Sequence, residues 1–186
     1  KLQIESEQYF LKNFQASQNF KSPAFIIGDL VGSVRLRREF GDAVGKALDC
    51  QAEMLFKKFK DKGFTLARDK GDFISFVFHN LSTDTSQSDV LERAFSVLQF
   101  LSESSSEFNG LPKSCGIPWA FEYRFVMSQL SDRPLDSESS PLSSFNLLSD
   151  SEIDQAHRVM SNVALAGECL VLERVFDSLK SDSSTK

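Results

Sequence analysis

The sequence predicts an α+β protein of the ferredoxin-like type, in which helices cover an antiparallel-rich sheet. Three observations predict this class. Apolar, β-branched runs alternate with longer segments whose apolar residues recur at helical spacing. Two strand-like runs are separated only by a short polar turn, as in a hairpin. No internal repeat is visible, and the order that results is β-α-β-β-α-β-α-β.

The first half of the chain contains three predicted strands and one long predicted helix. We expect a strand over residues 24–30, because this run is apolar and β-branched. A single helix is expected over residues 34–60, and Gly63 ends its apolar pattern. Residues 64–67 and 72–78 are predicted as the two strands of the hairpin.

The second half repeats the alternation with a longer irregular segment. An amphipathic helix over residues 90–101 is expected to cover the same sheet, and a loop follows it around Gly110 and Pro112. The later expected elements are a half-buried strand over 120–127, a long Ser-rich surface loop over 128–150, a helix over 153–166 ended by Gly167, a strand over 169–172 and a terminal helix over 175–179.

Composition places the chain among single-domain globular proteins. It has 186 residues, of which 41% are hydrophobic and 25% charged, and this suffices for one domain with a sizeable core. We expect an N-terminal arm over residues 1–22, the domain over 23–179 and a disordered tail over 180–186.

Charge and cysteine content exclude several classes of partner and site. The net charge is −5 and the pI is about 5.1, which argues against nucleic acid as the main partner. The three cysteines, Cys50, Cys115 and Cys169, have neither disulfide-framework nor zinc-site spacing, which fits a reducing cytoplasm. We find no apolar run long enough for a membrane span and no secretory leader, so a cytoplasmic protein without membrane contact is expected.

Two acidic residues are the strongest candidates for chemistry. Asp29 and Asp72 each lie at the edge of an apolar strand, and neighbouring strands would bring both carboxylates to one sheet edge. Such a pair can hold Mg²⁺ or Mn²⁺ together with substrate phosphates. Taken alone, each Asp is equally consistent with a helix cap or a turn acid.

Two features around the first Asp bear on phosphate binding. The Gly-containing turn after Asp29 leaves backbone N–H groups for phosphate, so the combination suggests nucleotide chemistry. The basic run Arg35-Leu36-Arg37-Arg38 follows this turn. It either supports a triphosphate or forms a solvated helix face.

Four motifs then resemble the successive signatures of class III nucleotidyl cyclases, over residues 24–174. They are Gly28-Asp29-Leu30-Val31-Gly32-Ser33, Gly41-Asp42, Lys70-Gly71-Asp72-Phe73 and Ile153-Asp154-Gln155-Ala156-His157-Arg158. The resemblance implies a nucleotidyl cyclase fold and conversion of a nucleoside triphosphate to a 3′,5′-cyclic nucleotide and pyrophosphate.

The resemblance also implies roles for individual residues. Asp29, Asp72 and the Leu30 carbonyl correspond to the ligands of two Mg²⁺ or Mn²⁺ ions. Arg158 corresponds to the Arg that stabilises charge on the α-phosphoryl group, with Asp154 at the ribose-binding position. The backbone that binds triphosphate corresponds to Val31, Gly32, Ser33 and Val34. A head-to-tail homodimer with shared sites is implied, since the family pairs the acids of one protomer with the Arg of the other.

The departures from the family pattern concern the ribose, the phosphates and the base. Asp154 stands where many relatives have Asn, and Val34 stands where relatives often have Thr. At the positions that read a purine, the chain has Arg68 and Leu147, and Arg68 is a candidate donor to a base edge.

These departures leave three functions open. Compact stand-alone relatives make cyclic CMP or cyclic UMP as antiphage signals, and this chain is similar to them in size, in the absence of appended domains and in the loss of the purine-reading pair. The alternatives are an adenylate cyclase and a degenerate domain that binds nucleotide or a partner without turnover.

Overall fold

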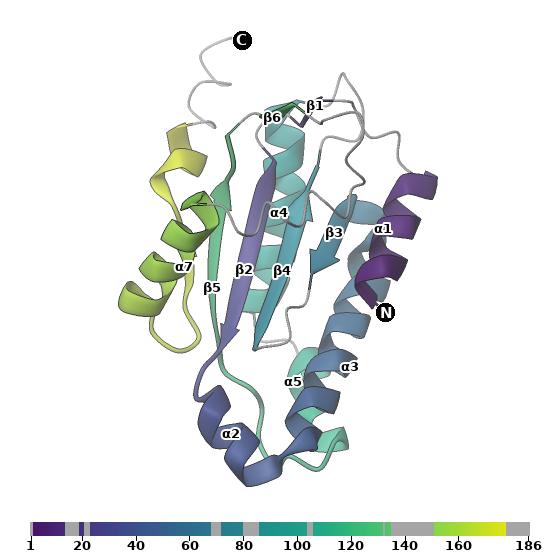
Figure 1. Cartoon of the computed structure of the whole chain (residues 1–186), viewed down its shortest axis with the longest axis vertical. Helices are drawn as coiled ribbons and strands as arrows, with labels where there is room; N and C mark the ends of the chain where they lie inside the picture. The colour runs from purple at the N-terminus through teal and green to yellow at the C-terminus, as the bar shows by residue number, and fades with distance from the viewer. Residues whose placement is uncertain are drawn as a thin grey trace.

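The computed structural model describes residues 2–13, 19–20, 23–67, 72–79, 86–103, 106–131, 133–134 and 151–177. Its main sheet has five strands in the order β3-β4-β2-β5-β7 (Figure 1). Strands β5 and β7 are parallel, and the other neighbours are antiparallel. The predicted α+β class is therefore confirmed. The strands are β2 (Ala24–Leu30), β3 (Phe64–Ala67), β4 (Phe73–Phe78), β5 (Tyr123–Gln129) and β7 (Cys169–Val171).

Helices lie on both faces of this sheet. In Figure 1, α4 runs behind the strands, with α3 beside it, whereas α7 lies at the left of the view next to β5 and packs on the other face of the sheet. A separate two-residue pairing joins β1 (Asn19–Phe20) to β6 (Arg133–Pro134). The helical elements are α1 (Leu2–Asn13), α2 (Ser33–Phe40), α3 (Asp42–Phe59), η1 (Lys60–Lys62), α4 (Gln87–Ser102), α5 (Ser106–Ser114), α7 (Ser151–Val163) and residues 173–177.

The alternation of side chains along β2 divides the core into two clusters. Ala24 and Ile26 are completely buried against α3 and α4, in a cluster that also contains Phe76 of β4. Phe25 and Ile27 point to the other face, where they pack with residues of α7. This is the period of two expected for a strand covered on both faces.

The long helix predicted over residues 34–60 is wrong as a single element, because Gly41 divides it into α2 and α3. Gly41 has φ 53° and ψ −128°, a conformation that only glycine adopts readily. Its N–H bonds to the Arg37 carbonyl at 2.9 Å and so closes α2. Apolar spacing continues across the break, and for that reason periodicity did not reveal it.

The loop predicted around Gly110 and Pro112 is also corrected, since it contains helix α5. Proline has no N–H, so Pro112 leaves the carbonyl of Phe108 without its usual helical donor. The buried side chain of Gln51 on α3 supplies that donor, with Nε2 3.1 Å from the Phe108 oxygen. Tyr123 of β5 donates in turn to Gln51 Oε1 at 2.6 Å. One glutamine therefore joins α3, α5 and β5.

The N-terminal arm begins with helix α1, which covers the open edge of β3. The Ser6 hydroxyl donates to the Leu66 carbonyl at 3.3 Å and accepts from the Leu66 N–H at 3.1 Å. This occupies edge groups that a neighbouring chain would otherwise pair with. The limits of the arm and of the domain stay predictions, and residues 180–186 and most of the predicted loop 128–150 lie outside the described residues.

Across the part of the chain that the structure describes, no helix combines the length and apolar character needed to cross a bilayer.

Candidate active site

Asp29 lies near the C-terminal end of β2, where both neighbouring strands present side chains to it. It is opposite Phe73 of β4 and Arg124 of β5 in the sheet register. Arg124 Nη2 forms an ion pair with Asp29 Oδ2, and the two side chains are only 22% and 14% exposed. The Nη1 group of Arg124 also donates to the Ser161 carbonyl on α7, at 3.2 Å. Arg124 therefore ties the carboxylate of β2 to the helix on this face.

Asp72 lies directly before β4, and its carboxylate is paired with a different helix. Arg37 of α2 donates to Asp72 Oδ1 through Nε at 2.9 Å and through Nη2 at 2.7 Å. The arginine side chain is 40% exposed and the aspartate 19%. Because Asp29 is opposite Phe73, the residue after Asp72, the two acids lie at the same end of two adjacent strands.

The turn between β2 and α2 ends at a helix N-terminus that no side chain caps. Gly32 precedes the first residue of α2 with φ 70°, a left-handed conformation. It has no side chain to cap the helix, so the first N–H groups of α2 are left for another acceptor, and the helix dipole favours an anion there. Val34 is 71% exposed and offers no hydroxyl. A hollow of about 340 Å³ beside the turn is lined by residues that include Val31, Gly32 and Arg35.

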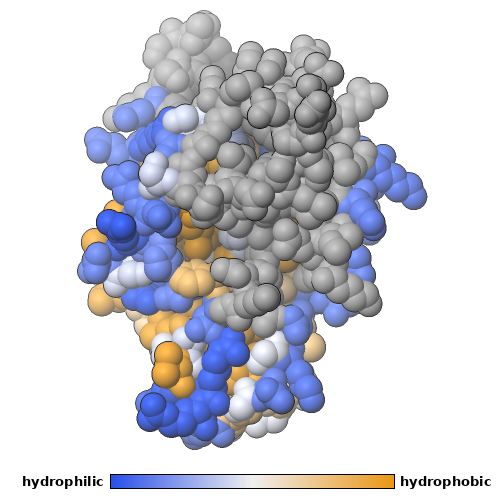
Figure 2. All heavy atoms as spheres, viewed as in Figure 1, coloured by the Kyte–Doolittle hydropathy of each residue, from blue (hydrophilic) through white to orange (hydrophobic). Residues whose placement is uncertain are grey.

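The surface at this end of the molecule is strongly polar. Figure 1 places α2 at the lower end of the view, and Figure 2 shows that end as predominantly hydrophilic, with apolar surface visible above it. Three arginines of α2 contribute to it: Arg35 lines the hollow, Arg37 pairs with Asp72, and Arg38 is exposed. The three arginines of the basic run therefore have different surroundings.

Helix α7 carries Asp154 and Arg158, and both side chains are exposed. The helix lies on the Asp29 face, where the His157 ring contacts the Phe73 ring edge-on at 4.7 Å between centroids. Among the described residues, neither the Asp154 side chain nor the Arg158 side chain forms a hydrogen bond or ion pair. Within one chain, Asp29, Asp72 and the turn between β2 and α2 therefore lie together. The side chains of Asp154 and Arg158 make no contact with them by hydrogen bond or ion pair. Arg68 lies outside the described residues.

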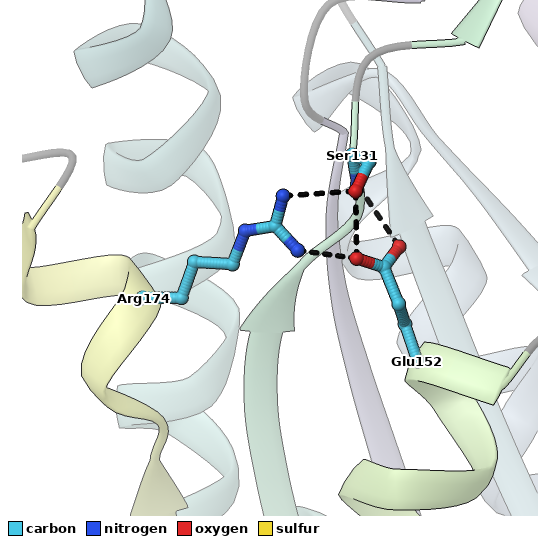
Figure 3. A network of polar contacts seen from close by, with 3 residues as sticks. All are labelled: Ser131, Glu152 and Arg174. Atoms are coloured by element: carbon cyan, nitrogen blue, oxygen red, sulfur yellow. Dashed lines mark hydrogen bonds and ion pairs between the residues drawn. The ribbon is translucent and has the colours of Figure 1, made fainter.

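A polar clamp holds the first turn of α7 (Figure 3). We define it as Ser131 after β5, Glu152 of α7 and Arg174 of the helical segment 173–177. Ser131 donates to the Glu152 carboxylate through its N–H at 3.0 Å and its hydroxyl at 2.7 Å. Arg174 forms an ion pair with Glu152 and donates to the Ser131 hydroxyl at 3.0 Å.

The clamp changes the acidity of Glu152. Burial alone would raise its pKa, but the hydrogen bonds from Ser131 and the charge of Arg174 outweigh burial, and the pKa lies below its usual value. Glu152 is therefore ionised at neutral pH, two residues before Asp154. The contacts of Glu152 with Ser131 and Arg174 hold the first turn of α7, the helix that carries Asp154 and Arg158.

The donor set is suited to a hard divalent cation that arrives with its substrate. The described residues contain no cluster of three or more His, Cys, Asp or Glu side chains arranged as a metal cage. Asp29 and Asp72 are two carboxylates at one sheet end, and Mg²⁺ commonly uses one or two carboxylates, with water and substrate phosphates as its other ligands. The residues present therefore fit Mg²⁺ or Mn²⁺ bound together with a nucleotide.

Two arginines of the candidate site were not predicted as partners of the carboxylates: Arg124, which pairs with Asp29, and Arg37, which pairs with Asp72. Arg124 is one of the polar positions in the alternating pattern of β5, and Arg37 belongs to the basic run of α2. Both signals were present in the sequence. Neither identified a carboxylate partner, because the pairs join residues 95 and 35 positions apart.

Comparison with solved structures identifies the fold. The chain is similar to the crystal structure of the adenylyl cyclase CyaB from P. aeruginosa, with a TM-score of 0.61 and 17% identity over 88% of this chain and 82% of that chain. For the guanylyl cyclase Cya2 the TM-score is 0.59, with 16% identity over 88% and 80% of the two chains.

A third similar structure is the non-canonical dimeric guanylyl cyclase domain of the RhoGC fusion protein from the aquatic fungus Blastocladiella emersonii. Its TM-score is 0.53, with 12% identity over 89% of this chain and 86% of that chain. No protein-family model and no curated protein matches the sequence. The chain has the fold of a class III nucleotidyl cyclase domain.

Proposed function

We propose that this protein is a metal-dependent nucleotidyl cyclase that converts a nucleoside triphosphate to a 3′,5′-cyclic nucleotide and pyrophosphate. One observation carries the proposal. Two carboxylates, Asp29 and Asp72, lie at one end of adjacent strands, beside a helix N-terminus suited to phosphate. Their setting is a fold that adenylyl and guanylyl cyclases share.

In this proposal the reaction forms one bond and breaks one. The ribose 3′-hydroxyl passes its proton to solvent water, and its oxygen attacks the α-phosphorus. The bond from the α-phosphorus to the bridging oxygen breaks at the same centre and releases pyrophosphate. The N–H groups of Gly32, Ser33 and Val34 hold the triphosphate, so the reacting atoms are positioned before bond formation. The Val31 N–H does not join them, because it donates to the Glu122 carbonyl at 2.9 Å. Arg158 donates to the α-phosphoryl oxygens as charge develops on them.

Asp29, Asp72 and the Leu30 carbonyl are the proposed ligands of the two Mg²⁺ or Mn²⁺ ions. When bound, such ions favour ionisation of the 3′-hydroxyl and neutralise phosphate charge. Arg124 keeps the Asp29 carboxylate at the end of β2, because it is also held by α7. No covalent intermediate on the protein is required.

A second copy of the chain is proposed to complete each site. Asp154 and Arg158 are exposed and, among the described residues, form no polar pair within their own chain. A head-to-tail homodimer would bring Arg158 of one protomer to the carboxylates of the other. A mixture of Asp72→Asn and Arg158→Ala chains should then recover activity, to about a quarter of the unmodified protein if chains pair at random. Two inactive variants that stay inactive when mixed would contradict shared sites.

A pyrimidine is the proposed base, and the product is then cyclic CMP or cyclic UMP, with a cytoplasmic role in antiphage signalling. Arg68 and Leu147 support this base, since they do not reproduce the pair that reads a purine in this family. An arginine donates to carbonyl acceptors such as those of a pyrimidine edge. Predominant formation of cyclic AMP would establish an adenylate cyclase instead.

The direct test incubates the purified protein with each of the four nucleoside triphosphates and Mn²⁺ or Mg²⁺, and identifies products by mass. We expect a metal-dependent cyclic product that Asp72→Asn reduces at least about 100-fold. Asp177→Asn is the matched control, because Asp177 is exposed in the segment 173–177, away from the carboxylates. Absence of cyclic product from all four substrates would favour the degenerate, non-catalytic domain.

A further inference from the structure

Two cysteines that are far apart in the sequence lie in contact between α3 and the end of α5. Cys50 is part of α3, and Cys115 directly follows α5. Both are free thiols of intermediate exposure, and their side chains form a hydrogen bond with each other. Neither belongs to the candidate active site. The fold therefore places a pair of oxidisable groups at a second location.

The backbones that carry the two thiols are held against each other. Figure 1 shows α5 beside α3, and Gln51, the residue after Cys50, donates to the Phe108 carbonyl of α5 at 3.1 Å. The Cys115 N–H donates to the Pro112 carbonyl at 3.0 Å, and the Cys115 side chain packs against the apolar core. The two sulfur atoms are thus neighbours before any covalent bond joins them.

We propose that Cys50 and Cys115 are a modification site, at which a low-molecular-weight disulfide of the glutathione class oxidises the two thiols to a reversible disulfide bond. The sulfur atoms must approach to about 2.05 Å for this bond, and thiols already in hydrogen-bond contact need little chain movement to do so. Disulfides in a reducing compartment are transient and follow the ratio of oxidised to reduced thiols. The bond would join α3 to the end of α5.

The reaction is a thiol–disulfide exchange in two steps. The Cys115 thiol loses its proton to solvent water, and its sulfur attacks one sulfur of oxidised glutathione, which releases one glutathione thiolate and leaves a mixed disulfide. The Cys50 thiol then loses its proton to water, its sulfur attacks the Cys115 sulfur, and a second glutathione thiolate leaves. Two protein thiols are oxidised, and one glutathione disulfide is reduced to two thiols.

The order of the two cysteines follows from their surroundings. Burial raises the pKa of the Cys50 thiol, and the charge of Cys115 and the hydrogen bond to it raise this pKa further. Cys50 therefore keeps its proton while Cys115 is ionised. Since the thiolate is the nucleophile, Cys115 attacks the oxidant and Cys50 resolves the mixed disulfide. Once Cys115 carries glutathione its charge is gone, so Cys50 ionises more easily for the second step.

The test uses the purified full chain, reduced with dithiothreitol and then equilibrated with mixtures of oxidised and reduced glutathione. Trypsin cleaves after Lys57 and Lys113 and so puts the two cysteines on separate peptides. We expect one product that is two hydrogens lighter than the reduced protein, in which the Cys50 and Cys115 peptides are joined. Dithiothreitol should reverse it. Cys169 should stay open to alkylation, because burial raises the pKa of its thiol to about 11.

Single variants test the order of the two steps. Cys50→Ser should stop at the mixed disulfide of Cys115 with glutathione. Cys115→Ser should form its adduct on Cys50 at least about fivefold more slowly. Cys169→Ser is the matched control and should form the same internal disulfide as the unmodified protein. If a serine variant does not fold, the alanine variant replaces it. The oxidised protein should also unfold at a temperature about 5 °C higher than the reduced protein.

Three results would overturn the proposal. Glutathione attached separately to Cys50 and Cys115, with no joined peptides, would mean that the two sulfurs cannot reach bonding distance. A disulfide that includes Cys169, or one that joins two chains, would mean that this pair is not the modification site. Equal rates of adduct formation in Cys50→Ser and Cys115→Ser would contradict the assigned order of attack.

Discussion

The two faces of the main sheet have different kinds of contact. On the face toward α3 and α4, Ile26, Leu66 and Phe76 are completely buried in a continuous apolar cluster. The face toward α7 has a smaller apolar cluster, with the Asp29–Arg124 ion pair at one end and the polar clamp at the first turn of α7. Nondirectional apolar packing stabilises the first face, while directional polar contacts on the second hold charged groups in defined positions.

This difference separates the residues that determine stability from those that position the site. A side chain lost from the α3 and α4 face leaves a cavity in a close-packed core. A polar side chain lost from the α7 face leaves no cavity in the apolar clusters, but it releases a helix that carries Asp154 and Arg158. Substitutions on the α3 and α4 face should therefore lower the free energy of unfolding more than they lower turnover. Polar substitutions on the α7 face should lower turnover more than the free energy of unfolding.

The largest effect is expected from removing a ring on the packed face. Phe76→Ala should lower the free energy of unfolding by about 4 kcal/mol, because Phe76 is fully buried and contacts Phe64 edge-on. Its counterpart Phe73→Ala, on the α7 face, removes a half-buried ring that contacts His157, and about 1 kcal/mol is expected. Urea denaturation measures both. Equal losses would contradict the division between the faces.

The second effect is a loss of stability at low pH, and it arises at the end of β4 remote from Asp72. His79 is buried, and burial, with a smaller contribution from the charge of Arg93, lowers its pKa to about 3. The stability that this neutral histidine provides is complete above the unfolded pKa of about 6.5 and is lost as the pH falls toward 3. Between pH 7 and pH 4 the free energy of unfolding should fall by ~3 kcal/mol through His79 alone.

The measurement for this effect is the pH dependence of urea denaturation. His79→Gln keeps a polar group near Thr65. Between pH 6.5 and pH 4 it should reduce the slope of the unfolding free energy against pH by the equivalent of one proton taken up on unfolding. His157→Gln, which replaces the other histidine, on α7, is the matched control. An unchanged slope in His79→Gln would show that other groups determine the acid sensitivity.

A third effect tests whether the clamp positions α7. Glu152→Gln keeps the shape of the side chain but removes its charge, so it should cost about 1 kcal/mol of stability and reduce turnover about tenfold. Because the pKa of Glu152 is lowered, the stability it contributes is present above about pH 4.5 and is lost as the pH falls through the lowered pKa.

Glu173→Gln is the matched control for the clamp, because Glu173 is exposed and lies next to Arg174. Mn²⁺ affinity should not change in either variant, since the clamp lies on α7 and not at the carboxylates. A loss of Mn²⁺ binding in Glu152→Gln would indicate general unfolding instead of a positioning role.

The smallest expected effect is a gain. Asp154→Asn removes a negative charge from the proposed ribose and triphosphate site and supplies an amide donor, so kcat/KM should rise about threefold. Initial rates with the preferred substrate measure it. Unchanged or lower kcat/KM would mean that Asp154 lies away from the ribose, or that its carboxylate has a positive role.

Much of the fold was predictable because its signals are local. The run 24–30 predicts β2 through the spacing of its apolar residues, and residues 64–67 predict β3 in the same way. The break at Gly41 was not predictable from periodicity, because both α2 and α3 keep apolar residues in register across it. Helix α5 was missed because Pro112 is a helix breaker unless a distant side chain, here Gln51, satisfies the carbonyl that it leaves free.

At the candidate site, neighbouring residues in the sequence were enough to predict two carboxylates at strand ends and a glycine turn before a helix. The partners of the charged groups became known only from the three-dimensional arrangement: Arg124 for Asp29, Arg37 for Asp72, and Ser131 with Arg174 for Glu152. The difference arises because the two kinds of feature depend on residues at different separations along the chain. Secondary-structure patterns depend on residues within one or two turns, whereas an ion pair depends on which strands are neighbours and in which register they meet.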